Sequence, residues 1–548
     1  MHYKGLERRL RDTYVVNSSA QNKNSLYDSY IKAFRWASDR LKDKGIIGFV
    51  TNGGYIDSNS ADGLRASLYK EFNYLYIFNL RGNARTQGEQ RRKEKDNIFG
   101  QGTRTPIVIS ILVKDGSDAH ELYYHDIGDY LSRKEKIQIL ENTGSVDELD
   151  WQRIIPDENH DWINQRNKEY LNYFPLYSKD SNSVFNDNCT GITTGRDAWT
   201  VGFSRNKVII NSEKMVNNYN DELKRFEDNN LKFNKENINK DGSFVKWDDN
   251  LFFKFKSREY IVLDQNQVIL YMYRPFVKKW IYFDNQIIQR QRKFKDLTVS
   301  NQSPFLYTTG RGASSFSALI SSLFVDKGLM SSGQGYYFSA NGVGLITEPQ
   351  PNMSDYGLQH YQLDSKELIC YVYALLSSTE YKEKYSNNMT KEAPRLPVVA
   401  EKEKYVEVGK KLMDLHINYE EVPVYEGVTI DAPENPSYKV KKMKFAKKRN
   451  PETQKLENDR SIIIFNSDIT IKNIPEKAYE YVVNGRSAIE WIIDQYQVKT
   501  DKKSGITDDP NDFSSDPKYI FNLLLRIINV SVQTVDLVNS LPKLEIIE

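Results

Sequence analysis

Clusters of lysine and arginine, some with aromatic rings among them, are the side chains in this sequence best suited to binding a polyanion. Segment 81–105 contains more basic than acidic residues. The acidic residues are Glu89, Glu94 and Asp96, and the basic residues are Arg81, Arg85, Arg91, Arg92, Lys93, Lys95 and Arg104. Such cations contact the phosphates of a nucleic-acid backbone. A solvated charged loop would explain the same composition, so both interpretations stay open.

Two more basic stretches lie further along the chain. The segments "YMYRPFVKKWIYFD" (271–284) and "IIQRQRKFK" (287–295) combine aromatic rings, which stack on bases, with the candidate contacts Arg274, Lys278, Lys279, Arg290 and Arg292. The run 439–449 holds seven basic residues and no acid, with Lys441, Lys442 and Lys444 as candidate phosphate contacts. A core strand with a charged outer face is the alternative for 271–284, and a solvated face is the alternative for 439–449.

Two short motifs carry further candidates. Arg196 in "GITTGRDAW" (191–199) could bind guanine or a phosphate, but we favour a buried ion pair with Asp197. Asn52, Gly53, Gly54 and Tyr55 follow the apolar run 46–50, at the end of an expected strand where open α/β sheets bind ligands. A glycine turn that only reverses the chain is the competing interpretation.

Composition limits the remaining classes of site. The chain has 548 residues, enough for two to four domains, and a net charge of only +2. Cys189 and Cys370 lie far apart and the six histidines are scattered, so we expect no metal site, and a reducing, cytoplasmic location. The polar N-terminus predicts no signal peptide, and the lack of a long apolar run predicts no membrane span.

The expected elements that position these candidates are helices and strands in alternation. The pattern predicts a helix over 25–42 with Ser25 as N-cap, a strand over 46–50 covered on both faces, and a helix over 61–72. Strands over 74–80 and 106–113 follow. This order is typical of the trailing edge of a mostly parallel sheet, closed by an antiparallel hairpin and open where earlier strands would pair.

The remainder of the chain is mixed. We expect a polar, partly helical connection over 116–172, then a region of short strands and turns over 173–548. Helices are predicted over 366–385, 403–422, 488–498 and 517–541. The predicted fold is therefore an α/β sheet over 1–115, followed by a mixed α+β domain whose C-terminal part, from about residue 366, is helical.

The chain resembles the C-terminal part of Type ISP restriction-modification enzymes. The stretches that carry the resemblance are "NKNSLYDSYIKAFRWASDR", "GIIGFVTNGGYID", "FNLRGNARTQGEQRRKE", "IFGQGTRTPIVISILVK", "GITTGRDAW", "YRPFVKKWIYFD", "YVYALLSSTEYKEKY", "APRLPV" and "YVVNGRSAIEWIIDQYQVKTDKKSGITDDPND". The resemblance implies that 1–115 is the second half of a Rossmann-like adenine-N6 DNA methyltransferase domain and 173–548 a target recognition domain. It also implies that Phe99, beside Gly100 and Gly102, stacks against the extruded adenine; the alternative is a packing residue.

The sequence departs from that family in its catalytic parts. It contains no Asn-Pro-Pro-Tyr tetrad, no glycine-rich S-adenosylmethionine loop and no acidic ribose ligand, so no catalytic residue is assigned. We expect the chain to be a fragment of a longer polypeptide, whose missing N-terminal portion would complete the S-adenosylmethionine site and hold ATP and Mg²⁺. The expected partners are double-stranded DNA and that missing portion, with no membrane.

Two alternatives remain. The chain could act alone as a DNA-specificity module without catalysis, or it could be a truncated standalone adenine methyltransferase with a fused recognition domain. The stretch 484–513 favours the Type ISP lineage over the second alternative.

Overall fold

The fold was analysed in a computed structural model, which describes residues 3–547 except 21, 101, 180, 292–303, 313–314, 331–334, 340–351, 452–453 and 455. The chain divides into two compact units. Unit 1 comprises 1–171 together with 384–392, and unit 2 comprises 172–383 and 393–548.

Unit 1 is built on a five-stranded mixed sheet in the order β1-β3-β2-β4-β5. Its strands are β1 Gly45–Asn52, β2 Tyr74–Asn79, β3 Ile107–Lys114, β4 Glu121–Asp126 and β5 Gln152–Ile154, and its helices are α1 Lys4–Leu10, α2 Ser29–Ser38, α3 Asp62–Glu71, α4 Gly88–Glu94 and α5 Arg133–Asn142. The segment 116–172, expected to be a connection, contributes β4 and β5 to the sheet. The second helix begins after an extended Asp28 rather than at Ser25, whose hydroxyl bonds that of Ser60 instead.

The strand order differs from the predicted edge hairpin. Strand β3 lies between β1 and β2 and is antiparallel to both, whereas β2 and β4 are parallel. The sheet is therefore mixed rather than mostly parallel.

One face of the sheet is only partly covered. Helices α1, α2 and α3 share a buried core with the first face, while α5 and its neighbours cover part of the second. On that second face Ile46 and Val50 of β1 are 67% and 54% exposed. The prediction that β1 is covered on both faces is wrong for the described residues.

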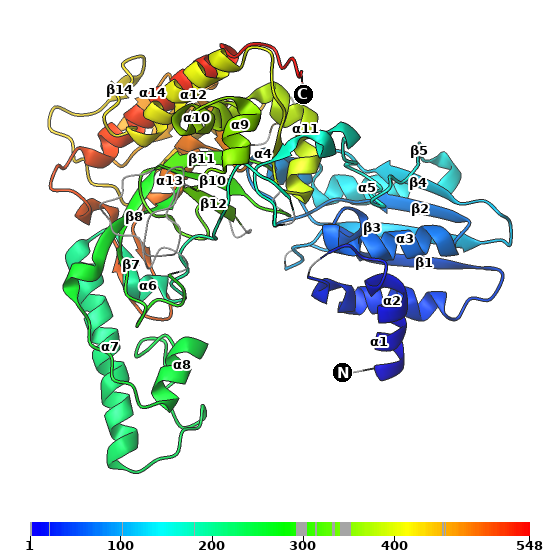
Figure 1. Ribbon diagram of the computed structural model, residues 1–548, viewed down its shortest axis with the longest axis horizontal. Helices are drawn as coiled ribbons and strands as arrows, with labels where there is room; N and C mark the ends of the chain where they lie inside the picture. The colour runs from blue at the N-terminus through cyan, green and yellow to red at the C-terminus, as the bar shows by residue number, and fades with distance from the viewer. Residues whose placement is uncertain are drawn as a thin grey trace. The chain divides into compact units, whose positions relative to one another are not determined.

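Unit 2 contains several small antiparallel sheets and most of the helices (Figure 1). The larger sheets have the orders β7-β9-β8, β11-β10-β12 and β14-β17-β16-β15, and the strand pairs are β13-β6, β18-β19 and β20-β21. Their strands are β6 Phe174–Pro175, β7 Val201–Gly202, β8 Val268–Arg274, β9 Val277–Tyr282, β10 Phe305–Thr309, β11 Ala318–Ser321, β12 Gly335–Ser339, β13 Arg395–Leu396, β14 Thr429–Asp431, β15 Lys444–Arg449, β16 Leu456–Ile464, β17 Thr470–Lys472, β18 Val482–Val483, β19 Arg486–Ser487, β20 Lys499–Thr500 and β21 Thr507–Asp508.

The helices of this part of the chain form two groups. They are α6 Asp197–Thr200, α7 Arg205–Asp228, α8 Asp249–Lys256, α9 Asp355–Tyr361, α10 Ser365–Ser377, α12 Lys402–Ile417, α13 Ala488–Gln495 and α14 Tyr519–Asn539. Helix α11 Thr379–Lys391 is divided, since its residues from 384 onward belong to unit 1. Helices α7 and α8 share a core of their own and extend from the rest of unit 2 (Figure 1). Helix α14 is long and apolar enough to cross a membrane by length and composition, but its apolar residues pack in the main core of unit 2.

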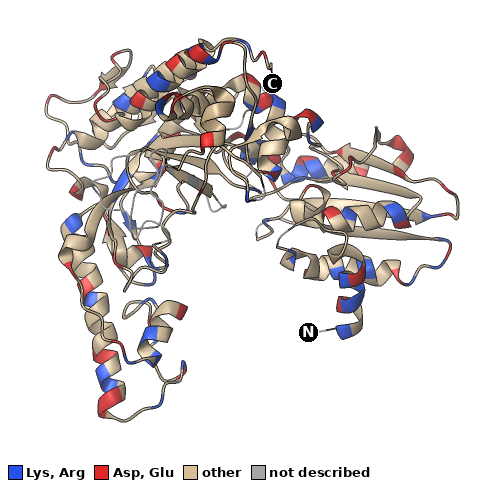
Figure 2. Cartoon of the chain, viewed as in Figure 1, with Lys and Arg blue, Asp and Glu red and all other residues tan. Residues whose placement is uncertain are grey.

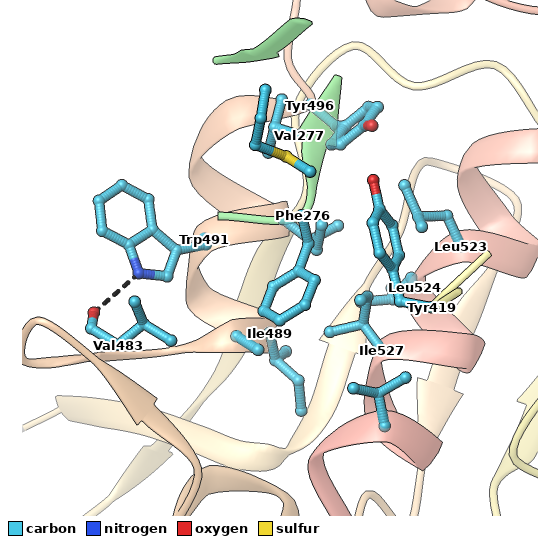
Figure 3. Close-up of a cluster of buried hydrophobic side chains, with 14 of the residues drawn as sticks. Phe276, Val277, Tyr419, Val483, Ile489, Trp491, Tyr496, Leu523, Leu524 and Ile527 are labelled. Atoms are coloured by element: carbon cyan, nitrogen blue, oxygen red, sulfur yellow. Dashed lines mark hydrogen bonds between the residues drawn. The ribbon is translucent and has the colours of Figure 1, made fainter. Parts of the chain in front are cut away.

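That main core is aromatic and draws on distant segments. Phe276 lies among residues of α13 and α14, and Trp491 donates a hydrogen bond to the Val483 carbonyl at 3.0 Å (Figure 3). Phe276 and Pro275 form the turn between β8 and β9, with a positive φ of 60° at Phe276. The stretch 271–284, for which a single core strand was one of two interpretations, is therefore a hairpin.

Candidate nucleic-acid interface

The basic insertion of unit 1 is partly neutralised by its own fold. Arg81 forms ion pairs with Asp126, the last residue of β4, at 2.6 Å and with Asp129, which follows that strand, at 2.5 Å. Arg92 pairs with Glu89 and Arg91 donates to the Lys95 carbonyl, both within or just beyond α4. Two predicted contacts of this insertion are exposed and have no ion pair within the described part of the chain, namely Arg85 and Arg104.

Phe99 stands on a rigid turn of the same insertion. The Asn97 side chain donates to the carbonyls of Gly82 at 3.2 Å and Thr105 at 2.8 Å, which joins the two legs of the loop. The Asn97 side-chain oxygen accepts from the Phe99 amide at 3.0 Å, and its carbonyl accepts from the Gly100 amide at 3.0 Å. The Phe99 side chain is nevertheless 61% exposed. An exposed ring on an ordered backbone is available to stack on a base.

Lys136 of α5 lies beneath this loop, and sequence analysis did not single it out. Its side chain is fully buried, and its ammonium donates to the carbonyls of Leu80, Glu94 and Asp96 at 2.9, 3.1 and 2.8 Å. Burial lowers the pKa of Lys136 to about 8. In the sequence it stands within "RKEK", which looks like an ordinary solvated helix, so no local signal marks it.

The turn after β1 proves largely structural. Asn52 caps it by accepting from the Gly54 amide at 2.9 Å, and a side chain at Gly53 would meet a Val108 methyl at 2.5 Å. The Tyr55 ring is fully buried against Phe34 and its hydroxyl bonds Ser110 at 2.6 Å, so desolvation raises its pKa. Tyr55 is a core residue, which agrees with the competing interpretation of a structural turn, and proximity of this turn to a substrate stays a prediction.

Arg196 is also buried, but with a different partner from the one predicted. Its guanidinium pairs with Asp248 at 2.5 Å and donates to the Ile287 carbonyl, while Asp197 accepts from Thr194. Burial lowers the pKa of Arg196 from its usual value. The motif therefore supplies a structural arginine.

The structure brings the Arg196 motif together with the later basic segment. The Thr193 and Arg290 backbones exchange hydrogen bonds of 3.0 and 2.9 Å, and Arg290 is exposed. On the other side, the Ile192 amide donates to the Val325 carbonyl at 2.9 Å. Arg292 lies outside the described residues.

A cleft of about 650 Å³ opens beside this loop. It is lined by residues 192–199 and 326–328, and its charged lining includes Asp197, Asp326, Asp501, Lys246, Lys327 and Lys503. Burial raises the pKa of Asp326 to about 6. The three lysines went unrecognised in the sequence because they come from segments far apart in the chain.

The cations of the β8–β9 hairpin are engaged within unit 2. Arg274 pairs with Asp326 at 2.9 Å and Lys278 with Glu420 at 3.0 Å. Lys279 pairs with Asp508 at 2.7 Å and lies 4.4 Å from the centres of two aromatic rings, those of Phe203 and Tyr273. These ion pairs agree with the alternative interpretation, a core strand with a charged outer face, and contact of the three side chains with DNA stays a prediction.

The cluster at 439–449 keeps its cations on the surface. Lys441, Lys442 and Lys444 are exposed, and the described residues give none of them an ion pair. Strand β16 pairs with the whole of β15, and Lys448 of β15 lies 3.8 Å from Asp459 of β16. Basic and acidic residues alternate along α7 in Figure 2, so unit 2 lacks a uniform charge there.

No group of side chains able to hold a metal ion occurs among the residues described.

This chain belongs to the family of the Type ISP C-terminal specificity domain, whose profile matches residues 183–523, more than half of its length. A nuclease-deletion mutant of the Type ISP restriction-modification enzyme LlaGI, solved with a DNA substrate mimic, is 46% identical with a TM-score of 0.88. The alignment covers 100% of this chain and 51% of that one. The resemblance found in the sequence is thus confirmed.

Two further structures are similar over the whole chain. The ATP-dependent Type ISP enzyme LlaBIII bound to DNA is 38% identical, with a TM-score of 0.84 and coverage of 100% of this chain and 36% of its own. The DrdV–DNA complex is 26% identical, with a TM-score of 0.82 and coverage of 100% and 55%. This chain thus spans about half of the LlaGI mutant chain and a smaller share of LlaBIII. No match was found among curated proteins.

Proposed function

We propose that this chain recognises double-stranded DNA within a Type ISP restriction-modification enzyme, with unit 2 selecting the sequence and unit 1 forming part of the site of adenine-N6 methylation. The observation that carries the proposal is the match of 183–523 to a specificity domain. The similar LlaGI mutant and LlaBIII chains were both solved with DNA or its mimic. ATP and Mg²⁺ would act in parts of the longer enzyme beyond this chain.

The bare part of the sheet supports the methyltransferase role of unit 1. Among the described strands β1 pairs only with β3, so its other edge has unused backbone donors and acceptors. Ile46, Gly48 and Val50 on the exposed face lie opposite Val113, Ile111 and Ile109 of β3. Such an apolar face beside an open edge is suited to packing against further strands and helices.

The residues of unit 1 do not by themselves fit S-adenosylmethionine. The sequence has no glycine-rich loop for the cofactor, and the cavity bounded by Asp157, Arg166 and Asn388 is only about 30 Å³. No catalytic step is therefore assigned to this chain. Taken alone, the chain is better suited to recognition than to catalysis. The second candidate function is therefore a DNA-specificity module that acts without catalysis.

Selection from a pool of duplexes tests recognition directly. The purified chain should enrich one short asymmetric sequence over several rounds, at a salt concentration near ~150 mM to suppress nonspecific binding. Retention of all sequences alike would contradict sequence recognition, and no retention at all would contradict DNA binding.

Phe99 provides the test of the methylation site. In the longer enzyme, Phe99→Ala should lower methylation by roughly ten- to a hundredfold, the loss of about 1–3 kcal/mol of stacking on one base. Phe99→Trp should retain more activity because it keeps an aromatic face. Binding to a duplex with an abasic target position should be equal in all three proteins. Equal loss of activity in both variants, with reduced thermal stability, would show that Phe99 only packs.

A further inference from the structure

Lys136 has an unusual environment for a lysine. Lysine side chains are almost never fully buried, yet this one is 0% exposed. Its three N–H donors have three acceptors, all of them backbone carbonyls, at 2.9, 3.1 and 2.8 Å. The hydrogen bonds described for the ammonium thus include no carboxylate oxygen, and the side chain serves the backbone around it.

The three carbonyls belong to the entry and the middle of one loop. Leu80 is the residue after β2, where the insertion begins. Glu94 ends α4, and Asp96 follows it at the foot of the turn that carries Phe99. A single ammonium therefore ties the entry of the insertion to its middle.

A second residue of α5 contacts the same turn from the surface. The Arg133 side chain donates to the Ile98 carbonyl at 2.7 Å, and its amide donates to the Asp96 carboxylate at 3.2 Å. With Asn97 bonded to Phe99 and to both legs, the backbone on either side of the exposed ring is fixed.

The chemistry explains why an ammonium occupies this place. An apolar side chain such as methionine would fill the same space without desolvating a charge. It would leave three carbonyls without their donor, however, and an unpaired buried polar group is destabilising. The three hydrogen bonds to the carbonyls therefore offset the desolvation of the ammonium, and they hold the loop in one shape.

We propose that Lys136 is a positioning residue for DNA: it fixes the loop 80–105 so that the Phe99 ring is held ready to meet an extruded base. The inference rests on the proposed function, because it gives that loop its role at the methylation site. Hydrogen bonds from α5 keep the loop rigid, and this rigidity determines how efficiently the extruded base is captured.

Hydrogen exchange of the purified chain tests the anchoring without DNA. In Lys136→Met the amides of Phe99 and Gly100 should exchange about tenfold faster or more, since the loop beneath them no longer has its charged donor. Lys136→Arg, which keeps the charge, should restore part of the protection. Lys134→Met, on the exposed face of the same helix, is the matched control and should leave the exchange unchanged. If Lys136→Met fails to fold, Arg133→Gln, at an exposed site, should still speed exchange at these amides.

A double-mutant cycle in the longer enzyme tests the positioning. Lys136→Met should slow methylation about tenfold in the wild-type background but add little to Phe99→Ala, because a ring that is absent cannot be positioned. A merely structural lysine would give additive effects in the cycle, and this result would overturn the proposal, as would unchanged exchange in Lys136→Met. If exchange rises while Phe99→Ala has no effect on methylation, anchoring by Lys136 stands and the proposed role of Phe99 fails.

Discussion

His416 should make the stability of unit 2 fall as the solution becomes acidic. The imidazole of this α12 residue is buried, and its two nitrogens lie 2.6 Å from the Tyr373 hydroxyl and 2.8 Å from the Thr534 hydroxyl. Thr534 donates its own proton to the Val530 carbonyl, so it accepts from the imidazole N–H. Tyr373 then donates to the other nitrogen, and this arrangement satisfies a neutral ring.

Protonation would place a charge in this buried site. Burial lowers the pKa of His416 to about 3, against about 6.5 in an unfolded chain. Between these values the unfolded state binds a proton that the folded state does not, so stability is complete at high pH and decreases as the pH falls below about 6.5. From pH 7 to pH 5 the decrease is about 2 kcal/mol.

Urea denaturation at pH 7 and pH 5 measures this decrease, with His416→Gln as the variant that cannot titrate. The free energy of unfolding should fall between the two pH values by about 2 kcal/mol more in the wild type than in His416→Gln. Asp326, whose pKa burial raises to about 6, acts in the opposite sense, so the difference between the proteins is the informative quantity. An equal pH dependence in His416→Gln would refute the reasoning.

Two further predictions concern charge. Replacing Lys441 and Lys444 by alanine should flatten the plot of log binding constant for DNA against log salt concentration. The slope should change by about one unit for each phosphate that is no longer neutralised. Unchanged affinity and slope would show that these lysines form only a solvated face. In unit 1, Lys391→Met should reduce thermal stability by about 3 kcal/mol, since its buried ammonium pairs with Asp161 at 3.1 Å and Asp57 at 3.2 Å. The exposed pair of Lys384 with Glu169 is the control, and Lys384→Met should change stability by less than about 1 kcal/mol.

The sequence predicted individual elements of unit 1 well, because their signals are local. Apolar runs and helical spacing marked β1, β2, β3 and α3 to within about two residues. The position of β3 between β1 and β2 was not predictable in this way, because hydrogen-bond partners in a sheet are chosen by segments far apart in sequence. Pro275 and Phe276 gave a turn signal that the aromatic run around them obscured.

The candidate interface was predicted less completely, for a related reason. A run such as 271–284 shows its cations but not the acids that will lie against them. Asp326, Glu420 and Asp508 neutralise that hairpin from positions 52, 142 and 229 residues away from their partners. Buried Lys136 was missed for the converse reason, since only the tertiary structure shows that its neighbours are carbonyls.

The paired and unpaired cations should therefore differ in what they contribute to DNA binding. A buried lysine already bonded to a partly buried carboxylate, such as Lys279 with Asp508, must leave that acid without its ion pair before it reaches a phosphate, which is unfavourable. Arg85, Arg104, Arg290 and Lys441 are exposed and have no ion pair with any residue that the structure describes. With a net charge of only +2, attraction to DNA depends on these local groups rather than on the field of the whole chain. We therefore expect exposure after folding, rather than the density of basic residues in the sequence, to distinguish the side chains that contact phosphate.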